Sequence, residues 1–195
     1  MLIAIHIAFL FTASVAPDHG CKVESGYHLE QPYEVFDQSN EGWRQLADNK
    51  CYVQAASIIE RYIEERSSEM RAAGKLRTLY WHAGQMRAVV GDYSTAIGHF
   101  ENAYPRDGAP VEMHLKADAV LAFLRKDRNR LEQIYQELIA LPEPAYFTDA
   151  VNEIRERDPE ARLPEWPLGL RSLKEFIKCF EEPYVVAYLS DQCDS

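Results

Sequence analysis

The apolar residues of this 195-residue chain recur at the spacing i, i+3, i+4, i+7 from Asn40 onward, and no convincing stretch alternates with period two. That spacing gathers apolar side chains on one face of an α-helix, whereas a half-buried strand requires strict alternation. Three stripes carry the pattern: Ala55, Ile58, Ile59, Tyr62 and Ile63; Leu76, Leu79, Tyr80, Ala83, Met86 and Val90; and Leu131, Ile134, Tyr135, Leu138 and Leu141. We therefore expect an all-α fold.

Turn-forming residues divide this region into helices of roughly 10 to 18 residues. The breaks fall at Ser67-Ser68, Gly74, Gly91-Asp92, Pro105 to Pro110, Lys126-Asp127 and Pro142 to Pro144. Helices of this length joined by short turns are typical of antiparallel helical hairpins. Residues 17–39, which contain Pro, Gly, Ser and Asp, are expected to form an extended N-terminal segment.

Three segments of the chain align as copies of one pattern. Residues 93–103 align with residues 52–62, so that an aromatic residue, an alanine, a large apolar residue and a glutamate coincide, and they align again with residues 128–138. The offsets are about 41 and about 35 residues, near the 34-residue period of tetratricopeptide repeats. The chain resembles that family best over residues 76–105, and less closely over residues 40–66 and 111–141.

Small residues mark where two helices of the best-matching unit must approach each other. Ala83 and Gly84 on its first helix and Ala96 on its second let the backbones come close, and Tyr80 and Phe100 fill the space around them. Glycine inside a helix costs about 1 kcal/mol relative to alanine, so crowding explains Gly84 better than helix propensity does.

The resemblance implies that residues 40–141 form antiparallel hairpins stacked in a right-handed array, and that residues 142–195 form a C-terminal helical cap. Within the cap we expect helices at 145–157, at Leu173–Phe180 behind an N-cap at Ser172, and at Tyr184–Leu189. Trp166 and Phe176 are expected to be buried against the third repeat. The alternative is that this region is a separate binding feature.

The resemblance also implies a groove lined by the first helix of each repeat. Its positions are Thr78, Trp81, Gln85, Ala88 and Val89 in the second repeat, and Met113, Lys116, Val120 and Phe123 in the third. An exposed Trp81 beside Gln85 and Lys116 suits an extended or helical peptide, although Trp81 and Phe123 are equally plausible as core residues. Lys116 alone does not supply the carboxylate clamp by which some members of the family bind chaperone C-termini.

The N-terminus and the cysteines bear on where the chain folds. Residues 1–16 pass from an apolar run to small residues, as in a secretory signal peptide, and the run is shorter than the roughly 20 residues that cross a bilayer. A buried N-terminal helix or strand is the alternative. Four cysteines without CxxC spacing favour two disulfides, and we prefer the local pairs Cys21–Cys51 and Cys179–Cys193 over four reduced thiols.

Charge and motifs narrow the possible functions. The net charge of -10 and the pI of about 5.1 argue against nucleic acid and anionic membranes as partners and favour a basic or neutral one. No two histidines have the i, i+4 spacing of a metal site, and no GxSxG motif is present. We therefore expect no metal, no cofactor and no catalytic residues.

The sequence thus predicts a non-catalytic scaffold that binds another protein or peptide, exported to the periplasm or secreted, in a bacterial cell envelope, without stable insertion in a membrane. Two alternatives stay open. One is a small exported hydrolase-like enzyme with its site in the C-terminal third, marked by a polar pocket near Trp166. The other is an acidic antagonist of a basic secreted protein.

Overall fold

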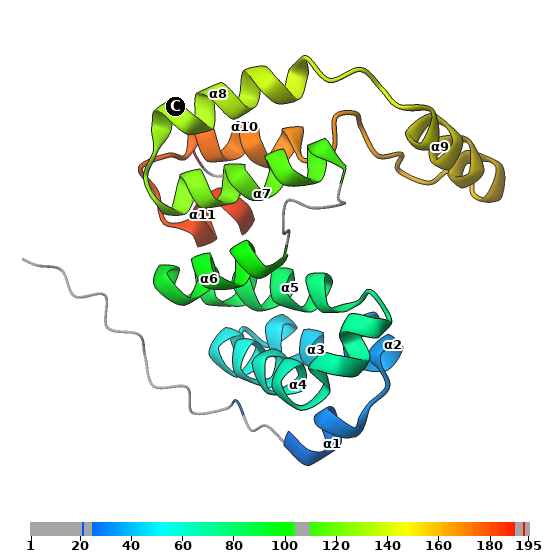
Figure 1. Cartoon of the computed structure of the whole chain (residues 1–195), viewed down its shortest axis with the longest axis vertical. Helices are drawn as coiled ribbons and strands as arrows, with labels where there is room; N and C mark the ends of the chain where they lie inside the picture. Colours follow the sequence, from blue (N-terminus) through cyan, green and yellow to red (C-terminus); the bar gives the residue numbers. More distant parts are fainter. Residues whose placement is uncertain (1–20, 22–24, 104–109, 190–192, 194–195) are drawn as a thin grey trace, which may run out of the picture.

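The computed structural model describes Cys21, residues 25–103, residues 110–189 and Cys193 (Figure 1). This part of the chain is helical and contains no strand, which confirms the all-α prediction. The helices are α1 (Ser25–Glu30), α2 (Tyr33–Phe36), α3 (Trp43–Asp48), α4 (Tyr52–Ala72), α5 (Leu76–Val89), α6 (Tyr93–Ala103), α7 (Val111–Leu124), α8 (Arg128–Ile139), α9 (Ala145–Arg157), α10 (Leu170–Lys178) and α11 (Tyr184–Leu189).

Helix α5 lies between two apolar cores and contributes to both. Leu79, Ala83 and Met86 belong to a core that they share with α1 to α4. Trp81 and Ala88, on the other side of the helix, belong to a core built from α6, α7, α8, α10 and α11. A helix that is apolar on more than one face must be buried on more than one face, so α5 joins the two halves of the molecule.

The contact between α5 and α6 depends on the small residues identified in the sequence. Ala83, Gly84 and Ala96 are all buried. A Cβ atom at Gly84 would lie 3.1 Å from the ring of Phe100, which is itself fully buried. Phe100 therefore packs directly on the backbone of α5, and a side chain at position 84 would push a fully buried ring out of its place.

The N-terminal segment is not extended as predicted, because it contains α1 and α2. Helix α1 packs on α4, and the ring of Phe36 stacks on the ring of Tyr62 with their centroids 3.8 Å apart. Arg66, on α4, donates hydrogen bonds to the carbonyl groups of Glu30 and Gln31. Helical structure thus begins well before Asn40, because apolar residues between positions 29 and 36 are buried against α4.

The predicted break at Ser67-Ser68 is also absent. Helix α4 continues through these serines to Ala72, and only a local distortion at Arg66, with φ of -122° and ψ of 18°, marks the position. Met70, beyond the serines, is buried in the N-terminal core. Burial of Met70 extends the helix past two residues that have weak helix propensity.

The C-terminal third forms two separate parts rather than one cap. Helix α9 stands apart from the other helices in Figure 1. Helix α10 packs on α7 and α8, and α11 packs on α10 and on α5. Helix α10 begins at Leu170, and its N-cap is Gly169, whose φ of 89° is in the left-handed region, rather than the predicted Ser172.

The two aromatic residues expected in the cap behave differently. Phe176 is buried, and its ring stacks on the ring of Phe123 with their centroids 4.8 Å apart. Trp166 is half-buried and packs on Phe147 of α9, while its indole N–H donates a hydrogen bond of 3.1 Å to the carbonyl of Leu141. Trp166 therefore anchors α9, contrary to its expected place against the third repeat.

Two disulfides pair Cys21 with Cys51 and Cys179 with Cys193, the local pairing preferred from the sequence. The first joins the N-terminal segment to the residue that precedes α4. The second joins the end of α10 to the chain that follows α11, and both of its cysteines are buried. Each disulfide thus fastens a terminal segment to the helical body.

The packing at Gly84 predicts a contrast between two glycine substitutions. Gly84→Ala should lower the free energy of unfolding by about 1 kcal/mol, because crowding against Phe100 costs more than the better helix propensity returns. Gly98→Ala, on α6 with no atom within 4 Å of the added Cβ, should raise it by about 0.5–1 kcal/mol. Urea unfolding followed by circular dichroism measures both, and equal stabilisation by the two alanines would contradict the proposed packing.

Candidate functional site

The residues predicted to line an open groove are mostly buried. Trp81 is 7% exposed and Phe123 only 1%, whereas Thr78, Met113 and Lys116 are half-buried. The buried members of the predicted set are Trp81, Gln85, Ala88, Val89, Val120 and Phe123. The cavity that remains beside Trp81 and Val120 measures about 10 Å³, which leaves no room for a peptide. The open groove is therefore not found.

Helices α10 and α11 occupy the place of the predicted groove. Phe123 contacts the rings of Phe176, Phe180 and Tyr184. The amide of Gln85 donates a hydrogen bond to the hydroxyl of Tyr188, and the backbone N–H of Tyr184 donates one of 3.0 Å to the hydroxyl of Tyr93. The C-terminal helices thus cover α5 and α7 through contacts between aromatic rings and through hydrogen bonds.

The composition of α7 indicates this covering. Its buried residues include Leu115, Ala119, Val120, Leu121 and Phe123, which point in all directions around the helix axis. A helix that is apolar all round is expected in an interior and not along an open groove. The apolar residues at 111–124 already indicate a buried helix in the sequence. The resemblance to a repeat instead predicted that the face with Val120 and Phe123 would line an open groove.

A polar pocket of about 440 Å³ lies between α7, the chain before α10, and the beginning of α10. Its polar side chains are Lys116, Arg162, Glu165, Arg171 and Ser172. It adjoins Trp166, where the enzymatic alternative expects a polar pocket. Among the described residues, Ser172 forms no hydrogen bond with a base, so the pocket contains charges that can hold an anion but no activated nucleophile.

A second hollow, of about 490 Å³, lies between α8 and α10. Tyr135 and Ile177 form its apolar part, and both are half-buried. Lys174 and Lys178 border it from α10, and Glu132 and Gln136 border it from α8. We refer to these six residues as the α8–α10 groove.

The cations of α10 form a stripe along its exposed face. Arg171, Lys174 and Lys178 are spaced i, i+3, i+7 and are exposed, whereas Leu173, Phe176 and Phe180 are buried on the opposite side. None of the three cations forms an ion pair or hydrogen bond with any residue that the structure describes. The i, i+3, i+7 spacing of these cations is visible in the sequence between positions 170 and 180, but it lies outside the repeats whose first helices were expected to line a groove.

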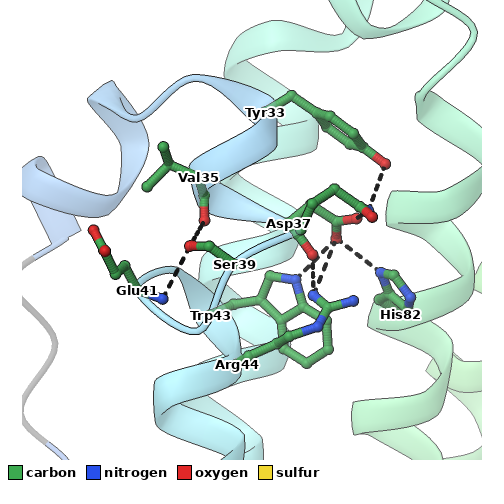
Figure 2. Close-up of polar contacts among 9 residues, drawn as sticks. Tyr33, Val35, Asp37, Ser39, Glu41, Trp43, Arg44 and His82 are labelled. Carbon is green, nitrogen blue, oxygen red and sulfur yellow. Dashed lines mark hydrogen bonds and ion pairs between the residues drawn. The ribbon is translucent and has the colours of Figure 1, made fainter. Parts of the chain in front are cut away.

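A buried carboxylate, Asp37, ties the turn between α2 and α3 to α5 (Figure 2). Its side chain is fully buried, and its Oδ1 atom accepts hydrogen bonds from Trp43 Nε1 at 2.9 Å and His82 Nδ1 at 2.8 Å. Arg44 donates to its backbone carbonyl. Burial alone raises the pKa of Asp37, but the hydrogen bond and charge of His82, with Trp43 and Arg44, outweigh it and lower the pKa.

An Asp–His pair of this kind also orients histidines in acid–base catalysis. Here the His82 ring lies against the Trp43 ring, with centroids 5.1 Å apart. In the described part of the chain, His82 forms no hydrogen bond with a serine, threonine or cysteine. The contacts of Asp37 thus account for a structural role, holding α2 and α3 on α5.

A second charged cluster links α4, α5 and α6. Glu60 accepts hydrogen bonds from Arg87 Nε at 2.7 Å and from His99 Nε2 at 2.8 Å. Burial raises the pKa of Glu60, but the hydrogen bonds and charges of Arg87 and His99 outweigh it and lower the pKa to about 2. Because Glu60, Arg87 and His99 lie on three successive helices, this cluster fixes the helices relative to one another.

Comparisons of the chain with protein families, with curated proteins and with solved structures found no match. Among the described residues, no three His, Cys, Asp or Glu side chains are grouped to hold a metal ion. No helix there is both long and apolar enough to cross a membrane.

Asp37→Asn should lower the free energy of unfolding at pH 7 by roughly 2–4 kcal/mol, because His82 and Arg44 lose their charged acceptor. Because folding lowers the pKa of Asp37, its carboxylate contributes its full stabilisation at pH values above the pKa of the unfolded chain. That stabilisation is lost as the pH falls through the pKa of the folded state. The gap between wild type and variant should therefore narrow below about pH 4. Asp48→Asn is the matched control and should change stability little, because Asp48 is exposed on α3 and forms no ion pair with another described residue.

Glu60→Gln should lower stability at pH 7 by about 1–2 kcal/mol, a figure reduced for the partial exposure of the cluster. Because the folded pKa is about 2, the contribution of Glu60 is complete above the ordinary glutamate pKa of 4.5 and disappears as the pH falls from 4.5 to about 2. Thermal unfolding across this range measures the effect against Glu64→Gln, an exposed neighbour on α4. An equal loss in both variants would refute the assignment.

Proposed function

We propose that this protein is a non-catalytic binding module that docks an acidic segment of another protein in the α8–α10 groove. The observation that carries the proposal is an apolar hollow of about 490 Å³ bordered by two lysines that have no anionic partner among the described residues. The partner segment would place an apolar side chain between Tyr135 and Ile177, with carboxylates toward Lys174 and Lys178.

The shape and composition of the α8–α10 groove support a peptide ligand. Tyr135 and Ile177 supply apolar contact area, and Gln136 supplies an amide that can donate and accept hydrogen bonds. An aromatic residue beside an aliphatic one is a common anchor site at protein interfaces, and a groove between two helices accepts a helical or extended segment.

The local charge favours an acidic partner even though the whole chain is acidic. Several cations elsewhere are neutralised, as Arg87 is by Glu60 and Arg130 is by Asp118 and Glu137. Arg171, Lys174 and Lys178 are not, so the positive field of α10 is available to a ligand. The apolar hollow beside them favours a protein segment over nucleic acid, which would need a longer run of cations along its backbone.

Export is part of this proposal. Two disulfides fit a chain that folds in an oxidising compartment. The apolar residues at the N-terminus lie outside the described part of the chain, and their signal-like composition supports the same proposal. The tetratricopeptide-like arrangement proposed from the sequence is supported by the successive contacts of α3 to α8.

Photo-crosslinking tests the docking surface directly. A benzoyl-phenylalanine placed at Tyr135 should crosslink one acidic protein from the native compartment, and the same group at Val53, an exposed residue of α4, should not. The crosslinked partner is then purified, and its binding to the wild-type protein is measured by fluorescence anisotropy.

Charge-reversal variants measure how much the two lysines contribute to the affinity for the partner. Lys174→Glu with Lys178→Glu should weaken binding of the purified partner at least about tenfold, because two attractive contacts become repulsive. Arg71→Glu with Arg77→Glu makes the same change in net charge at exposed residues of the N-terminal half and should leave binding unchanged. Equal weakening by both pairs, or crosslinking to nucleic acid, would overturn the proposal.

A further inference from the structure

The polar pocket beside Trp166 has a charge composition unlike the rest of the molecule. Three cations line it, Lys116, Arg162 and Arg171, against the single carboxylate of Glu165. This leaves an excess of two positive charges in a chain whose net charge is -10. No ion pair or hydrogen bond joins any of the three cations to a residue in the described ranges, so their charges are not neutralised within the fold.

Lys116 is held in place by the surrounding structure. Its stem passes beside Gly169, where an added Cβ would lie 3.2 Å from the Cγ atom of the lysine. Its Nζ atom lies 4.8 Å from the centre of the Trp81 ring. Burial lowers the pKa of Lys116, which means that its ammonium group is partly removed from water without receiving a negative partner. An anion beside it would relieve that cost.

The other groups in the pocket add donors suited to oxyanions. Arg162 and Arg171 each present a planar guanidinium, which binds the paired oxygens of carboxylates and phosphates. The hydroxyl of Ser172 can donate one further hydrogen bond. The left-handed conformation of Gly169 brings the first residues of α10 to the pocket wall, so the serine and Arg171 face the same space.

We propose that this pocket binds a small dianion, a phosphate or a dicarboxylate, through Lys116, Arg162 and Arg171. An excess of two positive charges matches a divalent oxyanion, and the volume of about 440 Å³ accommodates a small organic ligand that carries such a group. The pocket is distinct from the α8–α10 groove, because Lys116, Arg162 and Arg171 do not line that groove, although Arg171 also adds to the positive field of α10.

Titration followed by two-dimensional NMR of the ¹⁵N-labelled protein tests this site. The probes are inorganic phosphate and succinate, with acetate as the singly charged comparison, all at constant ionic strength. We expect saturable shifts of the Trp81 indole and the Gly169 and Ser172 amide signals with phosphate or succinate, and weaker binding of acetate. Which dianion binds more tightly identifies the phosphoryl or the dicarboxylate class.

Two variants link the shifts to the pocket. Lys116→Met keeps the length of the stem and removes the charge, and Arg162→Gln with Arg171→Gln changes exposed residues that leave the core intact. Each should weaken dianion binding at least about tenfold. Lys174→Glu with Lys178→Glu should leave it within about twofold, which separates this site from the docking surface.

Arg71→Gln with Arg77→Gln is the control for loss of two positive charges and should also leave dianion binding unchanged. If neither phosphate nor succinate produces saturable shifts at these signals, the proposal is wrong. It is equally wrong if the double arginine variant, with its spectrum otherwise unchanged, binds the dianions as the wild type does.

Discussion

The packing of α5 on both of its sides is the constraint on which the rest of the structure depends. One side of the helix completes the N-terminal core through Leu79 and Met86, and the other enters the C-terminal core through Trp81. At Gly84 the helix backbone is in contact with the ring of Phe100. Because both cores include α5, neither half can unfold without exposing apolar surface of the other, which favours one cooperative transition.

The sequence predicted where the helices lie in the chain better than it predicted which helices pack against one another. The spacing of Leu131, Ile134 and Leu138 marked a buried helix face, and all three are buried. The helices at Ala145–Arg157 and Tyr184–Leu189 were placed with the correct bounds. These are local properties, set by side-chain periodicity and by proline positions. The role of Gly84 was also accessible, because a glycine in the middle of a helix requires a steric explanation.

The face that each helix buries was less accessible, because it depends on segments distant in sequence. Trp81 and Phe123 lie on helix faces that a repeat array leaves open. Phe123 is buried by Phe176, more than fifty residues later in the chain, and Trp81 shares its small cavity with residues of α10 and α11. Helix α1 could not be predicted from its own residues, because its packing depends on α4. The net charge of the chain predicted a basic or neutral partner for a related reason. Glu60 and Asp37 are paired inside the fold, so the net charge does not describe the charge of the surface around α10.

The disulfide between Cys179 and Cys193 has a topological consequence for the cover over Trp81 and Phe123. It closes a loop of 14 residues in sequence separation, and α11 lies inside that loop. Helix α11 is therefore attached to α10 at both of its ends, so digestion by a carboxypeptidase from the C-terminus would stop before reaching it. Only a cut within the loop, or reduction of the cystine, would free α11 to leave α5. Phe123 would then lose the contact with the ring of Tyr184, while Phe176 of α10 would still lie against it.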